Sequence, residues 1–333
     1  MPLRSPLRSA AAAAAMVLGC GLAAPAQADP MLADFSYGRP IQHFGFNSQN
    51  QTLDMAYIDV MPAKPNGRTA VLLHGKNFCA VTWDATIKAL TGAGYRVIAP
   101  DQVGFCKSSK PERYQYGLHT LAANTHDLLT RLKIDKPVIV GHSMGGMLAM
   151  RYALQYPADV SKLVLVNPLG LEDWRAKGVP NTTVDRLYAS ELRTTRESLK
   201  AYQQSTYYAG QWRADYDRWV DMLASMYAGQ DGAIVAWSQA LTSDMVFNQP
   251  VIHEIQRIAV PTVLMIGEKD NTAIGKTRAD PVLRATLGDY PKLARAAAAR
   301  IPGAKLITYP DYGHSPQVQD AKRFNADLVK ALN

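Results

Sequence analysis

Cysteine is scarce in this 333-residue chain, which contains only Cys20, Cys79 and Cys106. The sequence has no H-E-x-x-H motif and no cysteine and histidine spacing of a zinc site, so no metal ion is expected. No G-K-[ST] follows its glycine-rich segments, which excludes a phosphate-binding loop, and no cofactor is implied. No apolar run is long enough to span a bilayer as a helix.

Basic residues outnumber acidic ones, 36 to 28, which gives a formal net charge of +8. They are spread along the chain and form no cluster interleaved with aromatic residues, so we expect no nucleic-acid partner. There is no internal repeat. A hydrophobic content of 47% with 19% charged residues is typical of a globular protein with a substantial core. The length fits one large domain or a domain with an insert, and it leaves the oligomeric state open.

The N-terminus has the order of segments that predicts a secretion signal over residues 1–28. Arg4 and Arg8 supply positive charge, residues 10–22 form a short apolar stretch, and the A-x-A sequence at 26–28 supplies a cleavage site. Cleavage removes two arginines and no acidic residue, so the formal charge falls from +8 to +6.

We therefore expect an exported protein, periplasmic or secreted, that is cleaved after Ala28 and begins at Asp29. The alternative is a lipoprotein anchored through Cys20, because V-L-G-C at 17–20 resembles a bacterial lipoprotein box. Cys79 and Cys106 remain after either cleavage, and oxidising compartments favour their pairing.

Short, continuous apolar runs alternate with helical patterns along most of the chain. This alternation predicts an α/β protein with a mostly parallel sheet covered by helices on both faces. The predicted strands are 51–60, 69–75, 95–101, 136–143, 162–168, 261–270 and 304–314, and the predicted helices are 81–92, 118–133, 145–156 and 316–332.

Between Pro168 and Pro261 no strand pattern occurs. This part of the chain holds four of the five tryptophans, and residues 213–227 have helical spacing. We expect a helical insert over residues 171–255 that packs over the sheet. Its aromatic side chains serve either as core or as the wall of a ligand pocket, and the sequence leaves both open.

The segment from 138 to 157, VIVGHSMGGMLAMRYALQYP, places a serine between glycines where a strand ends and a helix begins. Gly141-x-Ser143-x-Gly145 in this context is typical of a nucleophile elbow. The sharp turn requires a strained serine backbone, and the helix that follows directs its partial positive charge at an oxyanion.

A serine nucleophile requires a base, and the base requires an acid that orients it. His314 follows the last predicted strand, and loops at that edge of a parallel sheet meet in the crevice expected for Ser143. Asp270 ends the preceding predicted strand, and the order Ser143, Asp270, His314 fits such a triad. Glu268 and Asp280 are the alternative acids.

The sequence resembles the α/β-hydrolase superfamily over essentially all of 41–333. The resemblance rests on GHSMGG at the elbow and on the segments HGKNF, DQVGFCKSSKP, GEKDNTA and PDYGHSPQ. The resemblance implies a mostly parallel eight-stranded sheet flanked by helices, with a helical cap inserted after the sixth strand. The domains would be a hydrolase core at 29–170 and 256–333 and a cap at 171–255.

The resemblance also implies an oxyanion hole made of two backbone N–H groups. One belongs to Met144, and the other to Lys76 or, alternatively, Asn77. Relatives usually carry glycine at the position of Cys106. Because that fold places the loops of Cys79 and Cys106 at the same sheet edge, we expect a disulfide between them, with two free thiols as the alternative.

Ester hydrolysis of a small or medium, apolar or aromatic substrate through an acyl-enzyme is the activity we expect. The serine argues against haloalkane dehalogenases and epoxide hydrolases, whose nucleophile in this fold is an aspartate. Asn167 stands where dehalogenase-like members carry their acid, and it cannot ionise. The sequence is also similar to hydrolases that cleave carbon–carbon bonds in dienoate ring-cleavage products. A non-catalytic binding protein on the same fold is the alternative from another class.

Overall fold

One eight-stranded sheet forms the centre of the molecule, in the order β1-β2-β4-β3-β5-β6-β7-β8. The computed structural model describes Met1, residues 29–229 and residues 231–333, so the predicted signal sequence and Cys20 lie outside the described residues. The strands are β1 Gln42–Ser48, β2 Gln51–Val60, β3 Thr69–Leu73, β4 Arg96–Pro100, β5 Val138–His142, β6 Lys162–Val166, β7 Thr262–Gly267 and β8 Lys305–Tyr309.

The sheet is parallel from β4 to β8, and β1 and β2 join it as an antiparallel hairpin. Every residue of β5 and β7 is buried, as expected of central strands with helices on both faces. The carboxyl ends of β5, β6 and β7 lie side by side, so the loops that follow them share one edge of the sheet.

Helices α1 and α11 pack against each other, and α2 packs against α3. Helix α9 packs on β7 and β8. The helices of this core are α1 Asp84–Gly92, α2 Leu118–Arg131, α3 Met144–Gln155, α8 Pro281–Thr286, α9 Tyr290–Arg300, α10 Pro316–Gln319 and α11 Ala321–Leu332.

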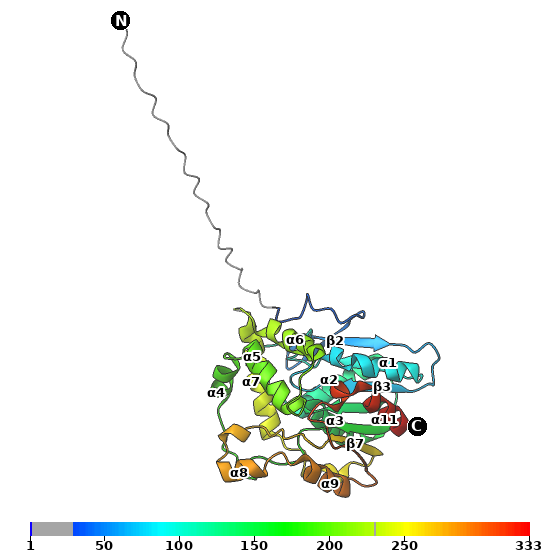
Figure 1. Ribbon diagram of the computed structural model, residues 1–333. Helices are drawn as coiled ribbons and strands as arrows, with labels where there is room; N and C mark the ends of the chain where they lie inside the picture. Colours follow the sequence, from blue (N-terminus) through cyan, green and yellow to red (C-terminus); the bar gives the residue numbers. More distant parts are fainter. Residues whose placement is uncertain (2–28, 230) are drawn as a thin grey trace.

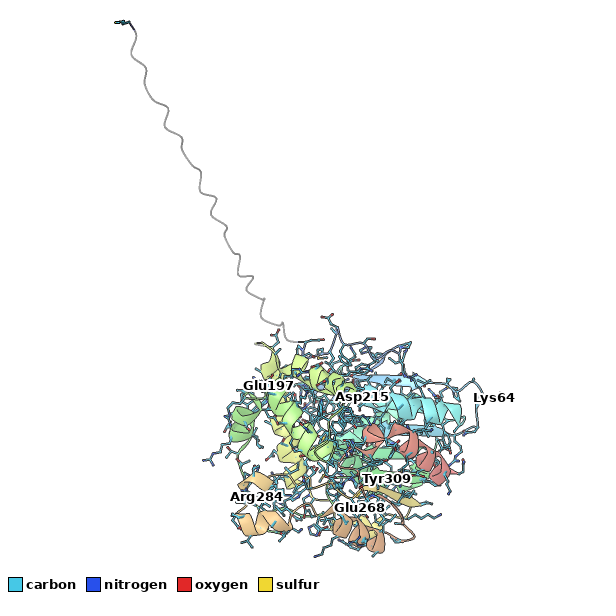
Figure 2. The ribbon with its side chains drawn as sticks, viewed as in Figure 1. Lys64, Glu197, Asp215, Glu268, Arg284 and Tyr309 are labelled. Atoms are coloured by element: carbon cyan, nitrogen blue, oxygen red, sulfur yellow. A yellow bond between two sulfur atoms is a disulfide. The ribbon has the colours of Figure 1, made fainter. Side chains whose placement is uncertain are left out.

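The chain between β6 and β7 is helical, and its described residues contain no strand. Its longer helices are α4 Val184–Glu191, α5 Arg196–Tyr202, α6 Asp217–Tyr227 and α7 Gly232–Asn248, and a π-helical turn, Gln203–Tyr207, follows α5. We call the segment from Val184 to Asn248 the cap. Its helices gather at one side of the molecule, with the sheet and α1, α3 and α11 at the other (Figure 1). Figure 2 shows Glu197 of α5 on the cap side and Lys64, before β3, at the opposite end.

The eight-stranded, mostly parallel sheet flanked by helices is as expected. The boundaries of the insert at 171 and 255 stay a prediction. Strand β1 and helix α9 were not predicted from the sequence. The helix predicted over 316–332 is two helices, α10 and α11, which meet at Asp320.

None of the helices formed by the described residues combines the length and the apolar character that a membrane crossing requires.

Candidate active site

Ser143 occupies the turn between β5 and α3. Its backbone has φ 57° and ψ −121°, a conformation that is strained for any residue with a side chain. The flanking glycines permit the turn because a Cβ on Gly141 would lie 2.1 Å from the carbonyl oxygen of Gly145. A Cβ on Gly145 would lie 2.2 Å from the carbonyl oxygen of Leu73. The serine hydroxyl therefore stands where β5 ends and α3 begins.

The structure brings together the three side chains that the sequence placed in a triad. His314 Nε2 lies 2.8 Å from Ser143 Oγ, and His314 Nδ1 lies 2.6 Å from Asp270 Oδ2. With Nδ1 protonated, the imidazole donates to the carboxylate and accepts from the serine hydroxyl. Ser143 and Asp270 are each 3% exposed and His314 is fully buried, so water has little access to these hydrogen bonds.

Asp270 is held by two residues, Asn167 and Thr272, that the sequence did not identify as its partners. Asn167 Nδ2 donates to Oδ2 at 2.9 Å, and Thr272 donates to Oδ1 through its backbone N–H at 2.9 Å and its hydroxyl at 2.6 Å. Asn167 follows β6 as Asp270 follows β7, so the shared sheet edge is the signal that could have identified it.

The two alternative acids lie elsewhere. Asp280 caps α8 by accepting hydrogen bonds from the N–H groups of Val282 and Leu283. Glu268 lies beside Tyr309, whose carbonyl accepts its N–H at 2.9 Å (Figure 2). The structure therefore places only Asp270, of these three acids, against the imidazole.

His142, next to the serine, braces the loop of His314. Its Nε2–H donates to the His314 carbonyl oxygen at 2.8 Å. Burial and the neighbouring His314 ring hold the pKa of His142 well below its usual value, so the ring is neutral. This geometry gives His142 a supporting role, with no hydrogen bond to Ser143 or Asp270.

Residues expected to form the oxyanion hole lie around the serine. Met144 is the first residue of α3, so its N–H has no partner within the helix. The loop from Gly75 to Asn77 runs against the elbow, since a Cβ on Gly75 would lie 2.9 Å from Ser143 Cβ. Lys76 and Asn77 come directly after Gly75 in this loop. That the second N–H of the oxyanion hole belongs to one of them stays a prediction.

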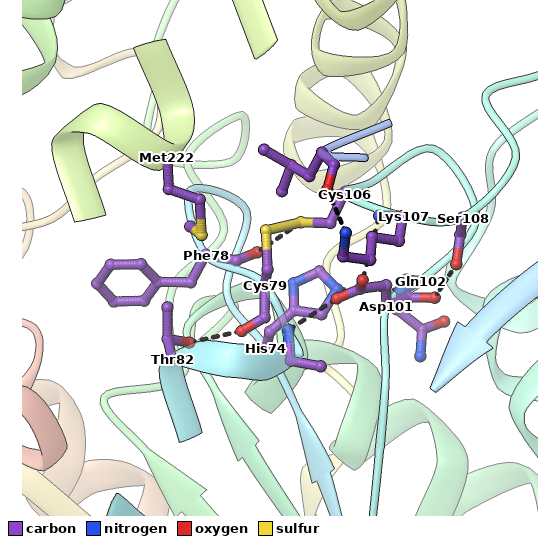
Figure 3. Close-up of a disulfide and its surroundings, with 12 residues drawn as sticks. His74, Phe78, Cys79, Thr82, Asp101, Gln102, Cys106, Lys107, Ser108 and Met222 are labelled. Atoms are coloured by element: carbon purple, nitrogen blue, oxygen red, sulfur yellow. Dashed lines mark hydrogen bonds between the residues drawn. A yellow bond between two sulfur atoms is a disulfide. The ribbon is translucent and has the colours of Figure 1, made fainter. Parts of the chain in front are cut away.

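Cys79 and Cys106 are joined by a disulfide whose Cα atoms lie 5.8 Å apart. The bridge links the end of the Lys76–Asn77 loop to the loop after β4. Beneath it, Asp101 accepts hydrogen bonds from the N–H groups of Ala80 and Lys107 (Figure 3). Among the described residues, these two cysteines and Asp101 are the one cluster with metal-ligand spacing, but sulfurs in a disulfide are not thiolate ligands.

Comparison with known proteins gives the class. The family model for the alpha/beta hydrolase fold matches residues 70–321. A solved structure described as a probable hydrolytic enzyme from Pseudomonas aeruginosa PAO1 is 56% identical, covers 93% of this chain and 99% of that chain, and has a TM-score of 0.91. An esterase from Exiguobacterium antarcticum, 21% identical with a TM-score of 0.69 over 88% of this chain and 100% of that one, shares the fold.

Among curated proteins, the 2-hydroxy-6-oxo-2,4-heptadienoate hydrolase of Pseudomonas putida is 31% identical over 48% of this chain. The chain spans less than two thirds of the length of several curated relatives, namely 65% of that hydrolase and 37% of an AB hydrolase superfamily protein of Bacillus subtilis.

The fold and the matched residues define the class of the protein. The chain belongs to the α/β-hydrolase family.

Proposed function

We propose that this protein is a serine hydrolase that cleaves carboxylic esters of small or medium, apolar or aromatic substrates. The observation that carries the proposal is the continuous hydrogen-bonded chain from Ser143 through His314 to Asp270 at the strand-to-helix turn. A hydroxyl becomes nucleophilic when a base this close removes its proton. The same chain of hydrogen bonds disfavours a non-catalytic binding protein.

The proposed reaction has two steps. His314 removes the proton of Ser143 as its oxygen attacks the ester carbonyl, and the N–H of Met144 with that of Lys76 or Asn77 stabilises the oxyanion. Asp270 stabilises the imidazolium, which then protonates the departing alcohol. Water, deprotonated by His314, attacks the acyl-enzyme, and the imidazolium returns the proton to the Ser143 oxygen as the acid is released.

Aromatic side chains around the triad support an apolar or aromatic substrate. The ring of Tyr207 lies 5.0 Å from that of His314, and the ring of Tyr290 lies 6.3 Å from it. Phe78 packs against Tyr207 at 5.3 Å. An apolar or aromatic group placed against these rings would be removed from water.

A cavity of about 440 Å³ at the border of cap and core is our proposed route to the serine. Tyr202 and Thr206 line it on the cap side, and Thr272 and Ala273 line it on the core side. Thr272 donates to Asp270, and the Thr206 carbonyl accepts the backbone N–H of His314, so two residues of the cavity wall contact the triad.

Hydrolysis of p-nitrophenyl esters by the mature protein tests the proposal. Ser143→Ala removes the nucleophile, so we expect kcat to fall by about 10⁴-fold or more with the fold intact by circular dichroism. Undiminished turnover by this variant would refute the assignment.

The second candidate is a carbon–carbon hydrolase of dienoate ring-cleavage products. The observation that favours it is the similarity to the heptadienoate hydrolase of Pseudomonas putida. A panel that compares kcat/KM for a dienoate product with kcat/KM for short esters separates the two, and faster turnover of the dienoate would favour this candidate.

We also propose that the protein is exported to the periplasm or secreted. The disulfide supports this, because disulfides persist in oxidising compartments.

A further inference from the structure

We propose that Glu191 and Tyr207 of the cap are positioning residues that hold the oxyanion loop, Lys76–Phe78, in its catalytic geometry. The proposal rests on the proposed ester hydrolysis. It makes the cap a fixed part of the catalytic machinery and not a lid that lifts at each turnover.

Glu191, at the end of α4, holds the first residue of the loop. Its Oε1 accepts from Lys76 Nζ at 3.0 Å, and its Oε2 accepts from the hydroxyl of Tyr227, in α6, at 2.8 Å. The side chains of Lys76 and Glu191 are 13% and 20% exposed. Since both carboxylate oxygens are bonded in this mostly buried position, the lysine is tied to two cap helices at once.

Tyr207, at the end of the π-helical turn, holds the next residue. Asn77 Nδ2 donates to its hydroxyl oxygen at 3.0 Å, and Tyr207 is 3% exposed. Burial raises the pKa of the Tyr207 phenol well above its usual value, so the hydroxyl stays neutral. Its ring also packs against Phe78, so the phenol touches two consecutive residues of the loop.

The π-helical turn holds the base as well. The carbonyl oxygens of Thr206 and Tyr207 accept the N–H groups of His314 and Ser315, each at 3.2 Å. The approach is close, because a Cβ on Gly313 would lie 2.8 Å from the Tyr207 carbonyl oxygen. Lifting this turn would release the imidazole loop and the oxyanion loop together.

The remaining end of the oxyanion loop is fixed by the core, since Cys79 is bonded to Cys106. Between the elbow and the disulfide, the side chains of Lys76 and Asn77 depend on the cap for their contacts. A misplacement of about 1 Å in a reacting geometry costs on the order of 10²-fold in rate. Loss of either cap contact should therefore slow the step in which charge develops on the carbonyl oxygen.

Two variants with matched controls test this. Tyr207→Phe removes the hydroxyl to which Asn77 donates, at nearly constant size. Glu191→Gln removes the negative charge and leaves one acceptor oxygen for the two donors, Lys76 and Tyr227. Tyr208→Phe is the control for the first, because its hydroxyl faces Gln203 at 3.4 Å. Asp217→Asn is the control for the second, because its partners, Lys200 and Arg196, both lie within the cap.

We expect kcat for p-nitrophenyl esters to fall about tenfold or more in Tyr207→Phe and in Glu191→Gln, with KM changed less than about twofold. The controls should stay within about twofold of the wild type. Binding of a trifluoromethyl ketone, which forms an oxyanion on the serine, should weaken by the same factor as kcat/KM. A purely structural role would not produce that match.

Wild-type kcat in both variants, with normal folding, would overturn the inference. If Glu191→Gln fails to fold, Lys76→Met breaks the same pair from the core side and must show the same loss of kcat. Normal kcat in Lys76→Met would then overturn the role of Glu191. A wild type that neither turns over esters nor reacts with a fluorophosphonate would instead refute the proposed function, so the two failures are distinguishable.

Discussion

His142 and His314 have ring centroids 4.9 Å apart, yet their hydrogen bonds differ. His314 uses both ring nitrogens, one toward Asp270 and one toward Ser143. His142 donates through Nε2 to the His314 carbonyl, and its Nδ1 has no partner among the described residues. Two histidines in one buried neighbourhood thus divide into one that can transfer a proton and one that supports it.

The lowered pKa of His142 predicts a pH dependence of stability. Its pKa in the folded state lies well below 6.5, whereas the unfolded chain has the ordinary value. Between these two pKa values the unfolded state binds more protons than the folded state. The stability that comes from keeping His142 neutral is therefore fully present above pH 6.5 and is lost as pH falls toward the folded-state pKa. Within this window we expect His142 to contribute a loss of about 1.4 kcal/mol in the free energy of unfolding per pH unit.

Urea denaturation at several pH values, in the wild type and in His142→Gln, measures this difference. The variant should show the shallower decline below pH 6.5. Equal slopes in the two proteins would count against a neutral His142.

The sequence was sufficient to predict Ser143 and His314 as partners, because the glycines and the ends of strands mark both positions locally. It could not predict Asn167 or Thr272, because their role depends on how the loops after β6 and β7 meet. The contact of Tyr207 with the oxyanion loop could not be predicted for a similar reason. Its contact with Asn77 joins residues 130 positions apart across the border of cap and core.

At the scale of elements, the buried strands were predictable because each is a short, continuous apolar run between turns. Strand β1 was missed because it is an edge strand of alternating exposed and half-buried residues, so its sequence lacks such a run. The π-helical turn was missed because its conformation is coupled to the His314 loop, a contact that local propensity does not encode.

The disulfide predicts a stabilisation that can be measured. Cys79 and Cys106 are 27 residues apart, and a loop of this size corresponds to about 3 to 4 kcal/mol in the entropy model. The double variant Cys79→Ser and Cys106→Ser should lose about that much free energy of unfolding in urea titrations. Reduction by dithiothreitol should bring the wild type to the level of the variant and leave the variant unchanged. A variant as stable as the oxidised wild type would contradict the prediction.

Filling the proposed cavity should change how kcat/KM depends on the chain length of the ester. Ala273→Trp places a large side chain on its core wall, so kcat/KM should fall more for long-chain esters than for short ones. The control is Ala299→Trp, which is exposed on α9 and should change neither. A uniform effect on all chain lengths would argue against this route to the serine.

At the scale of the whole molecule, the segment that begins at Asp29 links the cap to the core. The backbone N–H of Asp29 donates to the carbonyl oxygen of Ser225, in α6, at 3.0 Å. Leu32 is fully buried, and its carbonyl accepts from Lys107 Nζ, next to the disulfide. A mature chain that begins at Asp29 keeps all of these contacts.

We therefore expect the exported protein to begin at Asp29. N-terminal sequencing and intact mass measured on protein from the periplasm or the medium check this. A lipid-modified Cys20 at the N-terminus would contradict it and would favour the lipoprotein alternative.

Labelling by a fluorophosphonate, followed by peptide mass spectrometry, tests whether His314 and Asp270 activate Ser143, because an unactivated serine does not react. We expect one adduct, on the peptide that contains Ser143, and loss of labelling in His314→Ala with the fold retained. An unlabelled wild type, or an adduct on another serine, would contradict this activation.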